Sequence, residues 1–378
     1  MGHDVQKWRD LGTRVAFSGS RTPAATPLGS AEYKGSSIGT RLARQIATVV
    51  TPKGAQQMTA LMEKRIAIIG SGDLAAAYRD ALTYFPDLAL DAVTDPNLCQ
   101  AQPASERRPR LLRAADDLLR STVPHLALIC TPPAGHLEEV SPLLRAGVDV
   151  LVESPLASTR TDAEEITSLA ERIGRVVMTA EKFRVFDAVL EARKRIDLGR
   201  VGRLVYVEVT RSSKLDVSRA QHGNSHASGA GVWMAYGCDC LNLVEMLAGP
   251  LERIRMRRAA HLQGASIEDE ARVETDHGRG LMSRIDLSWN QEIPAPIARC
   301  VGERGEILIG WAQSVLRTET GKEIFAAGFD QREICRALLA RFLRERRRPE
   351  PVEDRGGQTL AWIEAAHRSL RSRRWELA

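Results

Sequence analysis

Short apolar runs alternate with amphipathic segments between about residues 62 and 183. Aliphatic runs of this length, bounded by turn residues, indicate strands buried on both faces, and the segments between them have helical spacing. The predicted strands are Ile66–Ile69, Leu88–Thr94, His125–Cys130, Val148–Val152 and Arg175–Thr179, and helices are expected after the first run and at about 116–120, 137–146 and 161–173. The alternation predicts a parallel sheet covered by helices on both faces.

A different pattern begins after Phe183. A helix at about 186–198 leads to Arg203–Thr210, where apolar and polar positions alternate as in a half-exposed strand. Further strands are expected at 251–258, 271–275, 280–289, 297–301 and 306–310, and further helices at Val232–Ala248 and at about 331–346 and 357–372. This pattern predicts an open, mainly antiparallel sheet with one face covered by helices. The other face is then available to pair with a second subunit.

The patterns divide the chain into two α/β domains, residues 62–183 and 184–378, with the last helices able to pack back on the first domain. Residues 1–61 lack apolar periodicity and are rich in Ser, Thr, Gly, Pro, Ala and Arg, so we expect a disordered extension. Three interpretations of this extension stay open. It is a gene-start artefact with Met58 or Met62 as the natural start, a targeting peptide, or an arm that wraps a partner subunit.

The formal net charge of +5 belongs to this extension, because residues 1–60 hold eight basic and three acidic side chains and the rest is balanced. A balanced body lacks the footprint of a nucleic-acid-binding protein, and no apolar run approaches the ~18 residues of a membrane-spanning helix. Six scattered cysteines without a secretory signal favour a reducing, cytoplasmic setting. Cys238 and Cys240 are too close together for a zinc hook, so we expect no metal site.

A glycine turn follows the first predicted strand, with the pattern Gly70-x-Gly72-x-x-Ala75 and then a helix. In a dinucleotide-binding turn the first glycine permits the tight bend, the second lets the backbone approach a pyrophosphate, and a small third residue lets helix and strand pack closely. The helix N-terminus adds free N–H groups and positive potential. The residues predicted to bind the pyrophosphate are Gly70, Ser71, Gly72, Asp73 and Leu74.

Further cofactor contacts are expected where the parallel strands end. Asp95 follows the second strand, where a carboxylate can accept hydrogen bonds from ribose hydroxyls and repel a 2′-phosphate, so we expect NAD in preference to NADP. Asp95 can equally cap the turn before Pro96. Ligands in such sheets bind at the carboxyl ends of the strands. The residues predicted to gather there are Thr131, Pro132, His136, Glu153, Ser154 and Pro155, together with Glu181 and Lys182.

From about Lys64 to Arg374 the chain resembles the glucose–fructose oxidoreductase / inositol dehydrogenase (Gfo/Idh/MocA) family. The resemblance rests on the order and spacing of RIAIIGSGDLAAAY, ALICTPPAGH, AGVDVLVESPLA, GRVVMTAEKFRVFDAV and GAGVWMAYGCDCLNLVEMLAG. It implies a Rossmann NAD(P)-binding domain followed by an α/β domain with an open sheet. It also implies homodimers or homotetramers, and oxidation or reduction of a sugar or cyclitol.

Two positions depart from the family's usual catalytic pattern. The lysine of its E-K-P motif is Ser154 here, and in the D-x-G-x-H-x-x-D pattern of the second domain the histidine is Asp239, with Ala235 and Asn242 replacing the acids. Hydride transfer at an alcohol needs a group that accepts or donates the hydroxyl proton. Serine has no useful pKa for that role.

Three other residues are candidates for the acid–base role: Asp239, Lys182 and His226. Asp239 occupies the matching helical position, Lys182 follows the strand next to Ser154, and His226 lies near His222 in a loop that lines the substrate site in the family. Each also has a structural interpretation. Asp239 then only satisfies its own hydrogen bonds, Lys182 only pairs with Glu181 or Glu153, and the histidines only belong to a surface loop.

Three functions remain open from the sequence. The first is an NAD-dependent oxidoreductase that acts on a sugar, cyclitol or related small polar molecule with a rearranged acid–base set. The second is a catalytically degenerate member that holds NAD as a structural ligand or serves as a partner subunit. The third uses NAD for elimination or glycoside cleavage without net oxidation.

Overall fold

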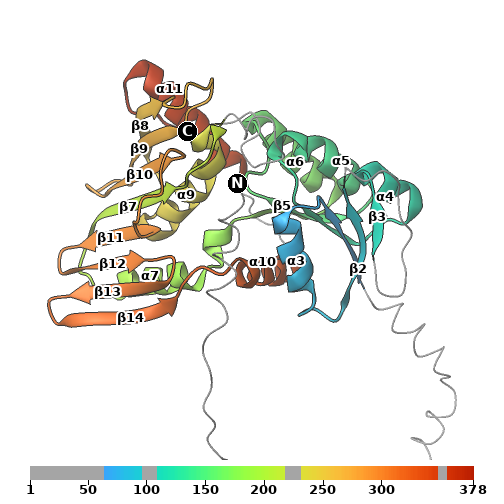
Figure 1. The fold of residues 1–378 in the computed structure, drawn as a ribbon, viewed down its shortest axis with the longest axis horizontal. Helices are drawn as coiled ribbons and strands as arrows, with labels where there is room; N and C mark the ends of the chain where they lie inside the picture. The colour runs from blue at the N-terminus through green and yellow to red at the C-terminus, as the bar shows by residue number, and fades with distance from the viewer. Residues whose placement is uncertain (1–63, 96–108, 218–230, 348–355) are drawn as a thin grey trace, which may run out of the picture. The chain divides into compact units, whose positions relative to one another are not determined.

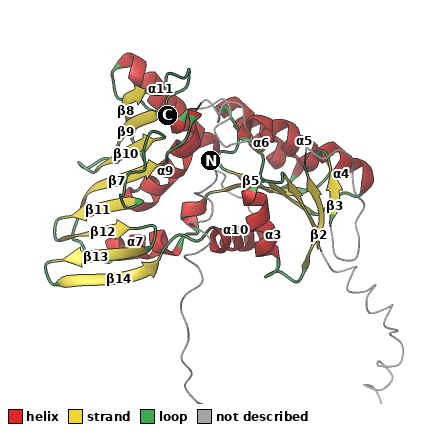
Figure 2. Cartoon of the chain, viewed as in Figure 1, coloured by secondary structure: helices red, strands yellow, loops and turns green. Residues whose placement is uncertain are grey.

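The computed structural model describes residues 64–95, 109–217, 231–347 and 356–378, all within one compact unit spanning Leu61–Ala378. Its secondary structure is drawn in Figure 2. The strands of these residues form two sheets, one of six strands and one of eight. The predicted extension and the two candidate histidines His222 and His226 lie outside the described residues.

The six-stranded sheet is parallel and doubly wound, with the strand order β3-β2-β1-β4-β5-β6. Its strands are β1 (Lys64–Ile69), β2 (Leu88–Thr94), β3 (Arg110–Leu112), β4 (Leu126–Ile129), β5 (Asp149–Glu153) and β6 (Val177–Ala180). The strand order reverses between β1 and β4, which is where ligands bind in such sheets. The predicted parallel sheet is confirmed, and β3 is an addition that the sequence pattern missed.

Helices cover both faces of this sheet. Its helices are α3 (Asp73–Leu82), α4 (Ala115–Ser121), α5 (His136–Arg145) and α6 (Arg160–Ile173). Helices α4, α5 and α6 lie side by side on one face, and α3 lies on the other (Figure 1). The strand residues Ile66–Ile69 and the whole of β4 are at most 1% exposed, which explains their continuous apolar sequence.

The eight-stranded sheet is antiparallel apart from the parallel pair β7–β10, and its order is β14-β13-β12-β11-β7-β10-β9-β8. Its strands are β7 (Leu204–Ser212), β8 (Arg253–Ala260), β9 (Glu270–Asp276), β10 (Met282–Ser288), β11 (Ala298–Gly302), β12 (Gly305–Ile309), β13 (Gln313–Thr318) and β14 (Gly321–Ala327). The predicted open, mainly antiparallel sheet is confirmed. The hairpin β13–β14 at its edge was not predicted.

The remaining helices follow the last strand of the six-stranded sheet in the sequence. They are α7 (Asp187–Asp197), α9 (Val232–Ala248), α10 (Gln331–Glu345) and α11 (Gly356–Ser372), with short 3-10 turns η1 (Pro133–Gly135) and η2 (Lys182–Arg184). Helix α9 packs on β7 and β10, and α11 packs on β8 and α6. Helix α10 packs on α3, so a late segment of the chain lies beside the first helix of the six-stranded sheet (Figure 1).

Candidate active site

The glycine turn between β1 and α3 contains one position where the protein itself requires glycine. Gly70 has φ +112°, and a Cβ there would stand 3.0 Å from the carbonyl oxygen of Cys130. The Gly70 N–H donates to Thr94 Oγ1 at 3.1 Å, which fixes the turn against the end of β2. A side chain at Gly70 would therefore strain the backbone and collide with β4.

Gly72 is different, because nothing in the protein requires a glycine there. It caps α3 with φ −72°, and a Cβ at this position would meet nothing within 4 Å. The first hydrogen bond of α3 runs from Ala76 N–H to the Gly72 carbonyl at 3.0 Å, so the N–H groups of Asp73, Leu74 and Ala75 precede the helical ladder. Open space beside these N–H groups fits a dinucleotide pyrophosphate.

Asp95 lies directly after β2, beside the same turn. Its N–H donates to the Leu112 carbonyl at 2.8 Å, and Thr94 before it accepts the Gly70 hydrogen bond. The end of β2 is thus held next to the glycine turn, as the predicted ribose contact requires. The contact itself stays a prediction.

A cavity of about 400 Å³ opens beyond the start of α3, between the carboxyl ends of the parallel strands and the second sheet. The predicted residues on its wall are Asp73, Leu74, Thr131, Glu153, Ser154, Pro155, Lys182 and Asp239. Pro133 lines the cavity while Pro132 does not, and His136 is 1% exposed, with its ring nitrogens 2.9 and 3.1 Å from the carbonyls of Thr131 and Leu156. His136 therefore fixes the loop around the cavity.

The structure joins two of the predicted catalytic residues. The Lys182 ammonium, on η2 just after β6, forms an ion pair with Oδ2 of Asp239 on α9. Arg211 NH1, from the end of β7, approaches the same oxygen at 3.2 Å. The Asp239 side chain is 7% exposed and that of Lys182 is 23% exposed, so the ammonium is the more accessible partner. Lys182 thus pairs with Asp239, and its charge also lowers the pKa of Glu153. Its roles as an ion-pair residue and as an acid–base group both stay predictions.

Eight residues of this wall were not among the predicted site residues: Pro133, Arg211, Leu215, Ala235, Tyr236, Trp289, Gln331 and Leu338. The guanidinium carbon of Arg211 lies 4.1 Å from the centroid of the Tyr236 ring, which meets Trp289 edge-on at 6.0 Å. The Tyr236 hydroxyl lies 3.2 Å from Ser213 Oγ. Tyr236 is one residue of the quoted α9 motif, whereas Arg211 and Trp289 carry no local signal because distant strands bring them here.

Glu153 is an acid of the cavity whose pKa is strongly shifted. Burial raises its pKa from 4.5 to about 7, against the lowering effects of a hydrogen bond from Tyr78 and of the Lys182 charge. The Tyr78 hydroxyl, on α3, donates to Glu153 Oε1 at 2.6 Å. Burial, with Glu153 beside it, also raises the pKa of Tyr78 well above its ordinary value, so this tyrosine keeps its proton. The pair gives the site a carboxyl group that titrates near neutral pH.

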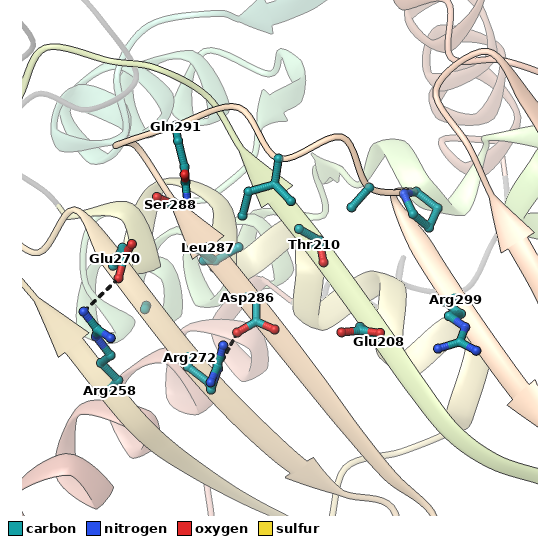
Figure 3. Close-up of a pocket in the computed structure, with 14 residues that line it drawn as sticks. Glu208, Thr210, Arg258, Glu270, Arg272, Asp286, Leu287, Ser288, Gln291 and Arg299 are labelled. Atoms are coloured by element: carbon teal, nitrogen blue, oxygen red, sulfur yellow. Dashed lines mark hydrogen bonds and ion pairs between the residues drawn. The ribbon is translucent and has the colours of Figure 1, made fainter.

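A second hollow of about 440 Å³ lies on the face of the eight-stranded sheet opposite α9 (Figure 3). Its wall carries ion pairs between neighbouring strands, Arg258 with Glu270 at 3.2 Å and Arg272 with Asp286 at 2.5 Å. None of the predicted site residues lines it. Because its charges are already paired and none of the predicted site residues lines it, we take the cavity that contains Lys182 as the candidate active site.

None of the helices in the described residues combines the length and the apolar content needed to cross a bilayer.

Two family models match the chain. The model GFO_IDH_MocA, described as an oxidoreductase family with an NAD-binding Rossmann fold, matches residues 64–181. The model of the GFO/IDH/MocA C-terminal domain matches residues 189–308. Together they cover both sheets' principal elements.

Curated relatives match over shorter stretches. D-glucoside 3-dehydrogenase of Escherichia coli is 30% identical over 153 residues, which cover 39% of this chain and 43% of that protein. Inositol 2-dehydrogenase of Corynebacterium glutamicum is 24% identical over 145 residues, covering 37% of this chain and 43% of that protein. The matches thus span less than half the length of these relatives.

Solved structures match over most of the chain. An oxidoreductase from Agrobacterium radiobacter, in complex with NAD+, L-tartaric acid and magnesium, superposes with a TM-score of 0.68 at 18% identity, covering 83% of this chain and 98% of that one. The WlbA dehydrogenase from Bordetella pertussis, in complex with NADH and UDP-GlcNAcA, gives 0.67 at 20% identity, covering 84% and 99%. These similarities show the fold.

Proposed function

The chain belongs to the Gfo/Idh/MocA family of NAD-binding oxidoreductases, and we propose that it oxidises or reduces a hydroxyl-bearing carbon of a sugar, a cyclitol or a related polar metabolite. The observation that carries the proposal is the Lys182–Asp239 ion pair on the wall of the cavity next to Ser154. This ion pair supports an acid–base role for Lys182, although the family's usual lysine position holds a serine.

The residues that would hold the cofactor are those of the glycine turn, the N-terminus of α3 and Asp95. The open space beside Gly72 and the free first-turn N–H groups fit its pyrophosphate. Bound NAD would supply the hydride acceptor or, when reduced, the hydride donor.

We assign proton transfer to Lys182. In the direction of reduction its ammonium donates a proton to the carbonyl oxygen, and in the direction of oxidation the neutral amine accepts the hydroxyl proton. Asp239 is more deeply buried and receives both Lys182 and Arg211 on one oxygen, so it positions the ammonium. Ser154, at the usual lysine position, leaves space for a side chain that enters from the neighbouring strand end. His226 remains a third candidate for this role.

The test compares variants of the pair in two measurements, NADH binding followed by fluorescence and turnover with a panel of sugars and cyclitols. Lys182→Met is expected to keep NADH binding and to lower kcat by about 10²- to 10⁴-fold, the contribution of a general acid–base group. Asp239→Asn, which removes the carboxylate that positions the ammonium, should also keep NADH binding and lower kcat. Lys182→Arg keeps a cation beside Asp239, but a guanidinium does not give up its proton near neutral pH, so this variant should be equally inactive.

Lys194→Met is the matched control, because Lys194 lies exposed on α7, 66% accessible, in an ion pair with Glu191. Full activity in Lys182→Met and Asp239→Asn would show that the acid–base assignment is wrong.

A second candidate function is a catalytically degenerate member that holds NAD as a structural ligand or acts as a partner subunit. It is favoured by the simultaneous replacement of both usual catalytic positions, by Ser154 and Asp239. NADH binding without turnover of any sugar or cyclitol would support it. NAD-assisted elimination or glycoside cleavage would instead give a product without net change in NADH.

A further inference from the structure

Arg211 presents an unused hydrogen-bonding edge to the same cavity. It is the penultimate residue of β7 (Leu204–Ser212), its side chain is 25% exposed, and it lines the cavity wall. NH1 lies 3.2 Å from Asp239 Oδ2, and the face of the guanidinium lies over Tyr236 at 4.1 Å. An ion pair on one edge and an aromatic ring on one face hold the plane of the group in place.

The other donors of this guanidinium have no recorded acceptor in the part of the chain that the structure describes. The group carries five N–H donors in a planar fork, and the contact with Asp239 uses only NH1. The remaining N–H groups of Arg211 therefore offer hydrogen-bond donors on the cavity wall that no described residue accepts from.

The balance of charge on the cavity wall also favours an anionic ligand. Lys182 and Arg211 both approach a single oxygen of Asp239, which leaves two cations against one carboxylate. Of the other acids of the cavity, Glu153 accepts the Tyr78 hydrogen bond and burial raises its pKa to about 7, so below neutral pH it is largely uncharged, and Asp73 is solvent-exposed at the start of α3. One positive charge on a rigid planar edge matches a single carboxylate, which accepts two parallel N–H bonds.

We propose that the substrate is a sugar acid, an aldonate or uronate, whose carboxylate binds Arg211 while its reacting hydroxyl lies at Lys182. This inference rests on the proposed function and names the substrate class of the same site. A phosphate carries a second negative charge and more acceptor oxygens, for which this wall offers no second uncompensated cation, so a sugar phosphate is the disfavoured anion.

The test is calorimetric titration of the NADH-loaded full chain with D-glucuronate and D-gluconate, against the neutral D-glucose and sorbitol and against D-glucose 6-phosphate. The acids should bind about 10- to 100-fold more tightly than their neutral counterparts, the range of a charge-assisted hydrogen bond. Arg211→Leu should abolish the preference. Arg160→Leu, which removes an exposed arginine of α6 paired with Glu164, should leave it unchanged.

The ratio of the affinities for sugar acids and neutral sugars distinguishes recognition of the carboxylate by Arg211 from a purely structural role of Arg211. If Arg211 only supports Asp239, Arg211→Leu will weaken acids and neutral sugars equally, and the proposal falls. Three results with the wild type would also overturn the proposal. They are equal affinity for sugar acids and neutral sugars, tighter binding of D-glucose 6-phosphate than of the acids, and no saturable binding of the acids to the NADH-loaded protein. Failure of NADH to bind would instead refute the proposed function, and the same ratio would then be measured on the protein without cofactor.

Discussion

Replacing Glu153 with glutamine is expected to stabilise the protein above neutral pH and to have little effect near pH 4.5. Glu153 lies at the end of β5 and accepts the Tyr78 hydrogen bond at 2.6 Å. Burial raises its pKa from 4.5 to about 7. Glutamine keeps the size of the side chain and an oxygen that accepts from Tyr78, but it cannot ionise.

The magnitude follows from proton linkage. Below about pH 4.5 the carboxyl group is protonated in both the folded and the unfolded state, so wild type and variant differ little. Between 4.5 and about 7 the unfolded chain loses the proton that the folded protein keeps, and the wild type loses stability as the pH rises. At about 1.4 kcal/mol per pKa unit, the loss approaches roughly 3 kcal/mol above pH 7. The cavity keeps the group partly in contact with solvent, so this figure is an upper value.

The assay is urea unfolding followed by tryptophan fluorescence, at about pH 4.5 and about pH 8. Glu165→Gln, at an exposed position of α6, is the matched control and should show no difference between the two pH values. A Glu153→Gln effect that is the same at both pH values, or that turns destabilising as the pH rises, would refute the assignment of Glu153 as a buried acid with a raised pKa.

Three further predictions concern the cofactor turn and the sheet surface. Gly72→Val should weaken NADH binding but leave the midpoint of urea unfolding nearly unchanged, because the added side chain enters open space in the protein. Gly70→Val should lower the midpoint of urea unfolding, because its backbone has φ +112° and the added Cβ meets the Cys130 carbonyl. Asp95→Ser should reduce the preference for NADH over NADPH in paired titrations, since the carboxylate that repels a 2′-phosphate is gone. We expect the open face of the eight-stranded sheet to pair with a second copy of the chain. Arg272→Glu replaces the ion-pair partner of Asp286 with a second acid on this face, so it should shift the sedimentation coefficient towards that of the monomer. An unchanged sedimentation coefficient would argue against this face as the interface.

The missed elements show where local sequence carries too little information. Strand β3 is three residues long, and the hairpin β13–β14 contains polar residues and glycine at the edge of its sheet. Their stability comes from hydrogen bonds to neighbouring strands, which a local pattern does not encode. The buried strand β4 and the helix α9 were predicted because their own apolar spacing specifies them.

The sequence by itself determined the two α/β parts, the glycine turn and the residues at the carboxyl ends of the parallel strands, because periodicity and backbone freedom are local properties. Only the tertiary structure decided which of these residues come into contact. Lys182 pairs with Asp239, and Tyr78 with Glu153, through the packing of elements far apart in the chain. Arg211 has no motif of its own, and it reaches the cavity because the strand that carries it ends beside Asp239.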